Sequence, residues 1–476
     1  MDFLFGNPPF VYPTTLNTYE TERIVIFLNW LFGMLGVLIF IALGIFGLAS
    51  YREQELRAAK IAWAVGIGSL VLFIVIALSP VGVQTLMMLI LLGLLLGGVF
   101  WGGLRHQLHL GKNDTPTVRF DERDVVFSRR WLIEGSEEYR SYYSMRPENE
   151  KIDAKIRVLP GVLSEDAKEG DYILFESANA SFMFTEALHQ AVEGQSGDEP
   201  RFMKPETLTS YIKDLAIFHG AHSVGITDLK EPHVYSHSGR GTTPYGQALE
   251  IEHTHAIAFT VEMSYEMMGT APKAPVVVES ARQYVEAAKI AIQIRFLLSR
   301  LGYRARAHID GDYQVIAPLV ARDAGLGEIG RMGLLMTPDL GPRVRIGVVT
   351  TDAPLIPDIR LDGAAMIDFC TQCKKCAENC PSRSIPFEDR QVYDGAYRWK
   401  IDPVSCFRYW NVIGTDCGVC MKVCPYSHPD TFFHNLLRGL ISHSAPGRRI
   451  AHKLDDVFYG RYPEVRPAPD WTNHGM

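Results

Sequence analysis

The spacing of the cysteines constrains this chain more than any other feature of its sequence. All eight cysteines among the 476 residues lie between residues 370 and 424. The first four, Cys370, Cys373, Cys376 and Cys380, follow the pattern C-x-x-C-x-x-C-x-x-x-C-P. The other four are Cys406, Cys417, Cys420 and Cys424, and a proline follows the last of them. These spacings and the two Cys-Pro endings are typical of a domain that binds two [4Fe–4S] clusters.

We expect the two groups to exchange their last cysteine, because in two-cluster ferredoxin folds the fourth cysteine of each run binds the other cluster. One cluster is then predicted at Cys370, Cys373, Cys376 and Cys424, and the second at Cys380, Cys406, Cys417 and Cys420. Cys406 stands eleven residues before Cys417, where an ordinary motif has a cysteine three residues before. A zinc ribbon would not explain the Cys-Pro endings, and disulfides are disfavoured in a reducing compartment.

Two long apolar runs precede this region. No charged residue occurs from Ile24 to Ser50 or from Ile61 to Leu104. Each run exceeds the roughly 20 residues that cross a bilayer, and the sequence SPVGVQT at 79–85 favours a turn within the second run. We predict three transmembrane helices near 25–50, 61–79 and 83–103 in a membrane domain of residues 24–104, after an N-terminal segment of residues 1–23. The alternatives are a cleaved signal peptide, whose apolar core would be shorter, and a buried hairpin of a soluble protein.

Basic residues flank these helices unequally. Arg52, Arg57 and Lys60 lie between the first two, and Arg105, Lys112 and Arg119 follow the third, whereas only Arg23 precedes the first. The positive-inside rule therefore predicts a multi-pass protein of the inner membrane with its C-terminal part in the cytoplasm. The first histidine of the chain is His106, so paired histidines cannot bind haem within the helices, and a plain anchor in membrane lipid is expected. The net charge of -7 predicts no nucleic-acid partner.

The remaining chain divides by composition. Residues 105–200 are charged and irregular, and we predict a linker or a cover for a substrate cavity. Residues 201–355 alternate between helical and strand patterns, with strands at 221–229, 254–263 and 343–355 and a long helix at 278–300 that Gly302 caps. This alternation predicts an α/β (α+β) domain. A ferredoxin-like domain at 356–435 and a C-terminal tail at 436–476 complete the chain. The sequence GLGEIG at 325–330 matches a dinucleotide fingerprint, but a helical pattern replaces the strand that should precede it, so NAD is not predicted.

Four stretches together resemble the reductive dehalogenases of the catabolic type. They are HIDGDYQVIAPLVARDAGLGEIGRMGLLMTPDLGPRVR at 308–345, CTQCKKCAENCP at 370–381, CFRYWNVIGTDCGVCMKVCPY at 406–426 and LDDVFYGR at 454–461. The resemblance covers roughly residues 200 to 465. It implies a nitroreductase-like domain that holds cobalamin, a corrinoid, in its base-off form beside two [4Fe–4S] clusters. The implied reaction is R–X + 2e⁻ + H⁺ → R–H + X⁻ on an organohalide. The chain has no D-x-H-x-x-G stretch for a histidine ligand to cobalt, and no twin-arginine export signal.

The resemblance also implies site residues. Tyr284 matches the proton donor, and Arg345 matches the basic partner, with Arg343 or Arg331 as substitutes. A guanidinium stabilises a phenolate and so lowers a tyrosine pKa from its usual value of about 10. The alternative for Tyr284 is an ordinary half-buried helix tyrosine. The expected corrinoid-binding residues are His308, Asp310, Gly311, Gly325, Gly327, Arg331 and Arg343.

Two other functions fit part of the sequence. An enzyme like epoxyqueuosine reductase would share the corrinoid and the clusters but would act on tRNA, against which the apolar helices and the absence of a basic surface count. A membrane-bound electron-transfer ferredoxin would leave residues 201–355 without a role. For the dehalogenase we expect an unidentified electron donor, which could be a ferredoxin, a flavoprotein reductase or a quinol-linked protein.

Overall fold

The structure is a computed structural model that describes residues 18–103, 114–194 and 199–473. The chain divides into two compact units, one comprising Met1–Leu104 with Val457–Tyr459 and the other Arg105–Asp456 with Gly460–Met476. Of the basic residues used to predict the orientation, Arg105 and Lys112 lie outside the described residues.

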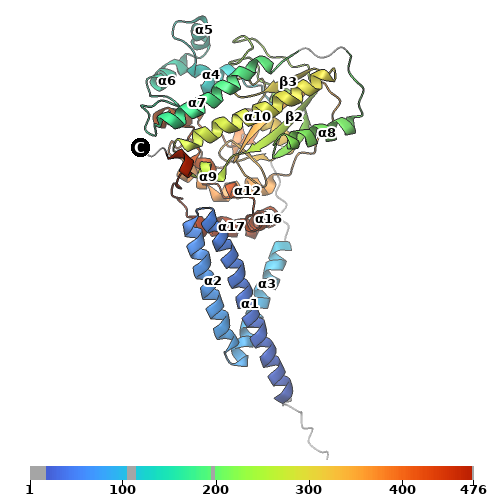
Figure 1. Ribbon diagram of the computed structural model, residues 1–476, viewed down its shortest axis with the longest axis vertical. Coiled ribbons are helices and arrows are strands. Elements are labelled where there is room, and N and C mark those ends of the chain that lie inside the picture. Colours follow the sequence, from blue (N-terminus) through green and yellow to red (C-terminus); the bar gives the residue numbers. More distant parts are fainter. Residues whose placement is uncertain (1–17, 104–113, 195–198, 474–476) are drawn as a thin grey trace, which may run out of the picture. The chain divides into compact units, whose positions relative to one another are not determined.

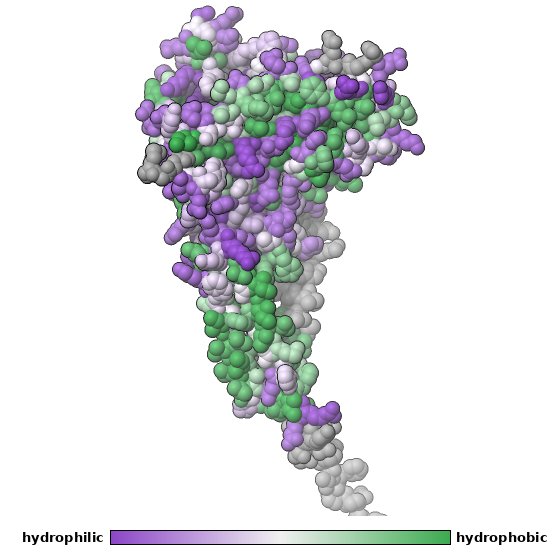
Figure 2. Space-filling model, viewed as in Figure 1, coloured by the Kyte–Doolittle hydropathy of each residue, from purple (hydrophilic) through white to green (hydrophobic). Residues whose placement is uncertain are grey.

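The first unit contains three helices, α1 (Thr18–Arg52), α2 (Leu56–Ala77) and α3 (Val81–Gly103). Figure 2 shows an apolar surface over α1 and α2. The exposed apolar side chains of α1 include Trp30 and Leu38. The segments Glu22–Arg52 and Leu56–Ala77 are long and apolar enough to cross a membrane, as predicted. The described apolar stretch of α3, Val81–Leu94, is shorter than a membrane span, so the third crossing stays a prediction.

The turn between α2 and α3 lies where the sequence SPVGVQT predicts it. The buried side chain of Gln84 donates hydrogen bonds to the carbonyl oxygens of Ala77 at 2.8 Å and Ser79 at 3.0 Å. The first bond satisfies a carbonyl group at the end of α2 that has no partner within the helix, and the second holds the turn that follows. Gln84 therefore stabilises the turn through its buried side chain.

The second unit is built on a four-stranded antiparallel sheet. Its strand order is β1 (Ser223–Asp228), β2 (His255–Glu262), β6 (Val344–Thr351) and β3 (Ala305–His308). β1, β2 and β6 were predicted, and the α/β (α+β) class of this domain is observed. β6 is last in the chain but central in the sheet, because it pairs with both β2 and β3.

Helices pack on both faces of this sheet, and Figure 1 shows α10 (Pro275–Arg300) crossing in front of the strands. α8 (Pro205–Phe218) and α10 share one hydrophobic core with the sheet, and α11 (Ala317–Asp323) packs in the core on the other side. α7 (Tyr172–Ala187) lies along α10. α10 ends where Gly302 adopts a φ of +91°, which confirms the predicted cap.

Most of the described part of residues 105–200 is helical, although its sequence shows no regular pattern, and its role as a linker or cavity cover stays a prediction. This part contains α4 (Val126–Arg130), α5 (Glu137–Met145) and α6 (Pro147–Arg157) as well as α7. Local capping explains two of these helices, since Ser136 accepts from the Tyr139 amide and Asp171 from the Leu174 amide. Arg119 donates to the carbonyl oxygen of Tyr235 and so belongs to this folded unit.

The cysteines lie on short elements after the sheet. These are α12 (Ala364–Cys373), α13 (Lys375–Asn379), α14 (Pro403–Ile413) and α15 (Val419–Lys422), with the hairpin β7 (Gln391–Tyr393) and β8 (Ala396–Arg398) between them. The remaining elements are α9 (Tyr265–Gly269), the hairpin β4 (Glu328–Ile329) and β5 (Leu335–Met336), α16 (Phe432–His443) and α17 (Ala445–Tyr459).

Candidate active site

Electrostatic interactions among the buried thiols follow the two predicted groups, with Cys376 acting on both. Burial raises the pKa of the Cys424 thiol well above its usual value, and the neighbouring thiols of Cys370, Cys376 and Cys373 raise it further. Burial likewise raises the pKa of Cys420, with contributions from Cys417, Cys406, Cys376 and Cys380. None of the eight forms a disulfide. Because iron binds thiolates, buried thiols of this kind fit a metal cluster that compensates for their charge.

Arg331 supports the loop of the first group. Its fully buried guanidinium donates to the carbonyl oxygens of Cys370 at 3.1 Å, Pro386 at 2.8 Å and Glu388 at 2.8 Å. It also lies 4.7 Å from the ring centre of Trp399. Since these bonds use most of its donors, the contacts of Arg331 favour a role in shaping this loop.

Tyr284 and Arg345 face each other. Tyr284 lies in the middle of α10 and Arg345 on β6, and the guanidinium carbon is 4.8 Å from the centre of the phenol ring. Burial raises the pKa of Tyr284 to about 12, while Arg345 opposes this shift. The guanidinium thus acts in the expected direction, but the loss of water around the phenol outweighs it. Tyr284 stays protonated at neutral pH and retains a proton to donate.

The position of Arg345 is fixed from the other side. Its Nη2 donates to the Ser280 hydroxyl at 2.7 Å and to Asp416 Oδ2 at 2.9 Å. Asp416 directly precedes Cys417 in the chain. One carboxylate therefore connects the Tyr284–Arg345 pair to the loop of the second cysteine group.

Three further ionisable groups surround this pair. Burial raises the pKa of Asp310, although Arg240 and Arg345 oppose the shift. Burial also raises the pKa of Tyr313 well above its usual value, and the nearby Asp310 adds to it. Arg240 forms an ion pair of 3.1 Å with Glu122. A concentration of shifted pKa values around one tyrosine is typical of a functional site.

Gly311 lies beside this group in a conformation that favours glycine. Its φ is +80°, and a Cβ atom there would lie 2.9 Å from Cε1 of His189. His189 Nε2 is in turn 2.7 Å from the carbonyl oxygen of Asp310. The predicted residues Asp310 and Gly311 therefore form one tight turn at the site.

The other predicted corrinoid contacts are engaged within the protein. His308 is fully buried, with Nε2 2.9 Å from the Thr350 hydroxyl and Nδ1 accepting from the Gln314 amide at 3.2 Å. Arg343 is also buried and forms an ion pair with Glu262 at 2.7 Å. These contacts favour structural roles for both side chains.

Gly325 and Gly327 follow α11. Gly325 adopts a φ of +81°, which suits the end of a helix. A Cβ atom on Gly327 would lie 2.1 Å from the carbonyl oxygen of Met336, so this glycine allows β4 and β5 to approach closely. Backbone geometry thus explains both glycines.

Arg240 and Asp416 are site residues that the sequence patterns did not predict. Neither residue belongs to a sequence motif that indicates its role, and both come close to Tyr284 only in the tertiary structure. The sequence GRG around Arg240 and the position of Asp416 before Cys417 were the only local signals.

A corrinoid fits the chemistry of this group. The imidazoles of His189 and His308 contact protein atoms. Arg345 Nε and Asp416 Oδ1 are buried and have no hydrogen-bond partner in the described structure. Such orphaned polar atoms can interact with a polar group of a bound molecule.

Comparison with known proteins agrees with this description. A family model described as a 4Fe-4S dicluster domain matches residues 369–428, so a domain of the two-cluster type is present. The chain is 32% identical over 296 residues to a tetrachloroethene reductive dehalogenase of Sulfurospirillum multivorans, a match that covers 55% of this chain and 58% of that protein.

Comparison with solved structures also finds similarity to reductive dehalogenases. A reductive dehalogenase whose structure was described as suggesting a mechanism for B12-dependent dehalogenation matches with a TM-score of 0.59 and 25% identity, covering 74% of this chain and 48% of that one. A catabolic reductive dehalogenase in complex with 3-bromo-4-hydroxybenzoic acid matches with a TM-score of 0.55 and 28% identity, covering 62% of this chain and 45% of that one. The chain spans about half the length of the relatives it matches. The resemblance to the reductive dehalogenase family, first indicated by the sequence motifs, is therefore confirmed.

Proposed function

We propose that this chain is a membrane-anchored reductive dehalogenase that replaces a halogen of an organohalide with hydrogen. Its nitroreductase-like domain holds cobalamin in the base-off form, and two [4Fe–4S] clusters deliver two electrons. The carbon–halogen bond breaks, the halide leaves with the bonding pair, and the carbon gains a proton. The observation that supports this most directly is the Tyr284–Arg345 pair, which Asp416 connects to the loop of the second cysteine group.

Bound cobalamin supplies the low-valent cobalt chemistry that cleaves carbon–halogen bonds. Tyr284 holds the proton on its hydroxyl oxygen until the carbon accepts it. Arg345 stabilises the phenolate that remains, and Asp416 and Ser280 keep Arg345 in place. Cys370, Cys373, Cys376 and Cys424 hold one cluster, and Cys380, Cys406, Cys417 and Cys420 hold the other.

We further propose that the N-terminal helices anchor the protein in the inner membrane and that its catalytic domain faces the cytoplasm. Membrane lipid is then a structural partner, and the electron donor is a ferredoxin, a flavoprotein reductase or a quinol-linked protein.

A reconstitution experiment tests the proposed function. Purified protein should contain cobalt and about eight iron atoms per chain when it is loaded with cobalamin and clusters. A chemical reductant should then produce halide from a panel of chlorinated and brominated alkenes and phenols. A pure electron carrier would bind no cobalamin, and an epoxyqueuosine-reductase-like enzyme would bind tRNA and release no halide. Either of these results would contradict the proposal.

A further inference from the structure

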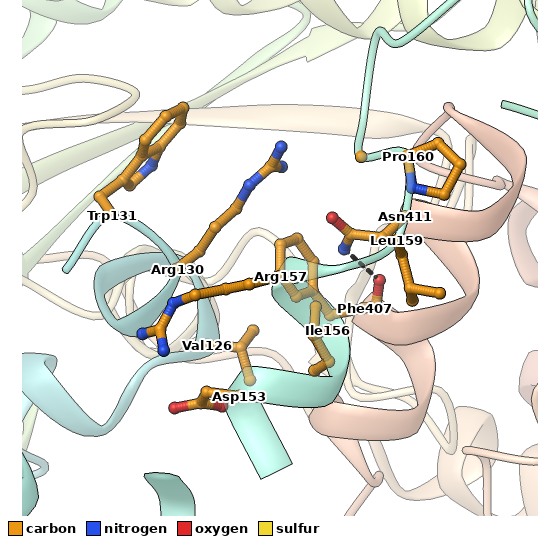
Figure 3. A pocket seen from close by; sticks show the side chains of 11 residues that line it. Val126, Arg130, Trp131, Asp153, Ile156, Arg157, Leu159, Pro160, Phe407 and Asn411 are labelled. Atoms are coloured by element: carbon orange, nitrogen blue, oxygen red, sulfur yellow. Dashed lines mark hydrogen bonds between the residues drawn. The ribbon is translucent and has the colours of Figure 1, made fainter. Parts of the chain in front are cut away.

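A separate cavity of about 200 Å³ lies among α4, α6 and α14 (Figure 3). None of Tyr284, Arg345 and Asp310 lines it. Since liquid water occupies about 30 Å³ per molecule, the cavity has room for several waters or for one small chemical group. Its lining contains the charged side chains of Arg130, Arg157 and Asp153.

Arg130 has no acidic partner within the described structure. Its guanidinium carbon lies 5.1 Å from the ring centre of Trp131 and 5.6 Å from that of Phe407. Burial lowers the pKa of Arg130, and no neighbouring carboxylate offsets the shift. A guanidinium has five N–H donors, and aromatic faces do not replace the acceptors that water would provide. The side chain is therefore a partly desolvated cation with donors available.

Asp153 does not neutralise Arg130. This carboxylate forms an ion pair of 3.1 Å with Arg129 and accepts a hydrogen bond of 2.9 Å from the Tyr143 hydroxyl. Figure 3 shows the head group of Arg157 on the side of Asp153, whereas Arg130 extends away from it. The lining thus carries two cations and one anion. Arg157 donates hydrogen bonds to the Arg129 carbonyl oxygen and the Tyr143 hydroxyl, whereas Arg130 has no hydrogen bond or ion pair within the described structure.

Gly161 keeps the space beside this guanidinium open. Its φ is +101°, and a Cβ atom there would lie 3.0 Å from Arg130 Nη2. Its amide donates to the carbonyl oxygen of Asn411 at 2.9 Å, which ties this loop to α14. The cavity is therefore bounded by fixed backbone and has an open position next to the available donors.

We propose that this cavity binds the oxyanion group of a small ligand, a phosphate or a carboxylate, and that Arg130 is its principal contact. The planar fork of a guanidinium matches both groups through paired hydrogen bonds. Trp131 and Phe407 hold the fork by stacking while its N–H groups remain available. The site is independent of the proposed dehalogenation, because no group of the Tyr284 site takes part in it.

Calorimetric titration of the full-length protein with inorganic phosphate, and separately with acetate, tests this inference at constant ionic strength. We expect saturable binding of at least one anion and a change in tryptophan fluorescence. Arg130→Gln should weaken binding at least tenfold. Arg140→Gln is a matched control, since Arg140 is exposed on α5 and donates to the Gly135 carbonyl oxygen at 2.6 Å. This variant should keep the parental affinity.

Further variants make the result decisive. Trp131→Phe should keep the calorimetric signal and lose the fluorescence change, which places the anion at this cavity. Absence of saturable binding in the parent protein, or equal affinity in a folded Arg130→Gln protein, would overturn the proposal. If Arg130→Gln does not melt like the parent, Arg130→Lys replaces it, because lysine keeps the charge but lacks the fork. Arg130→Lys with parental affinity for both anions would also overturn it.

Discussion

Tyr284 is the residue on which the proposed chemistry depends. Tyr284→Phe keeps the ring and its packing but removes the only proton that the side chain can transfer. A positioned general acid contributes about 10² to 10⁴ in rate. Halide release should therefore fall at least about 10²-fold, while bound cobalamin and the spectra of both clusters remain parental. A variant with full cofactor content and near-parental turnover would mean that another group donates the proton. Tyr313 is then the next candidate, whereas Tyr303 donates to the Arg201 carbonyl oxygen in the core.

Arg345 tunes the acidity of that proton. Since Arg345 opposes the rise in the Tyr284 pKa, Arg345→Gln should raise this pKa above its parental value of about 12. The Tyr284 hydroxyl then becomes a weaker acid. For each unit by which its pKa rises, the rate at pH 7 to 8 should fall by at most roughly tenfold. In a plot of rate against pH, any decline at high pH that is due to Tyr284 should lie near pH 12 in the parent and move to higher pH in the variant.

Two controls separate acidity from structure. Arg345→Lys keeps the charge and should retain more activity than Arg345→Gln. A fluorinated tyrosine at position 284 is a stronger acid, and it should restore part of the rate lost in Arg345→Gln. Absence of any such rescue would indicate that Arg345 acts only through packing.

At the scale of the element, α14 carries the displaced cysteine of the second group. Cys406→Ala should remove one thiolate of this cluster and leave the first cluster complete, because each cluster has its own four ligands. Iron content should fall from about eight to about four or three per chain, and one of the two paramagnetic signals of the reduced protein should change. Unchanged iron and spectra would show that Cys406 is not a ligand.

The start of β1 is tied to the turn at Asp339 by a pH-dependent contact. His222 Nε2 lies 2.5 Å from Asp339 Oδ2, and this hydrogen bond raises the pKa of His222. Although burial opposes it, the same bond lowers the pKa of Asp339 to about 2. The raised histidine pKa stabilises the fold below about pH 6.5 and loses this effect as the pH rises through the folded-state pKa. The lowered carboxyl pKa stabilises the fold above about pH 4 and loses this effect as the pH falls toward about 2.

The melting temperature of His222→Gln should therefore lie furthest below that of the parent near about pH 5, and the difference should shrink as the pH rises through the raised pKa of His222. Asp339→Asn should give the same dependence on pH. A difference that does not change with pH would show that the contact is not ionic.

The elements differ in how well the sequence predicts them, for physical reasons. β1, β2 and β6 are buried apolar runs, and α10 is a long amphipathic helix with a glycine cap, so local patterns suffice. β3 has four residues, of which Arg306 and His308 are polar, and only its pairing with β6 makes it a strand. α4 to α6 are short and rich in charged residues, so their few apolar residues do not show the regular spacing of a helix. The Tyr284–Arg345 pair was predicted from the family resemblance. Arg240 and Asp416 were not predicted, because only the tertiary structure brings them close to the site.

At the scale of the whole molecule, the side of the membrane on which the second unit lies can be tested directly. Arg52, Arg57 and Lys60 are expected to hold the α1–α2 loop in the cytoplasm. With three crossings, a fluorescent protein fused to the C-terminus should fold in the cytoplasm, and a phosphatase fused there should be inactive. A phosphatase inserted in the α1–α2 loop should also be inactive. An active C-terminal phosphatase would contradict the predicted orientation.

Among the three N-terminal helices, α3 has the shortest described apolar stretch. Whether the chain crosses the membrane an odd or an even number of times depends on this helix. With the α1–α2 loop held in the cytoplasm, an odd number of crossings leaves the catalytic unit in the same compartment as that loop. An even number would place it on the opposite side. Under the proposed function, this one helix decides from which compartment the clusters would draw electrons and into which compartment the halide would be released.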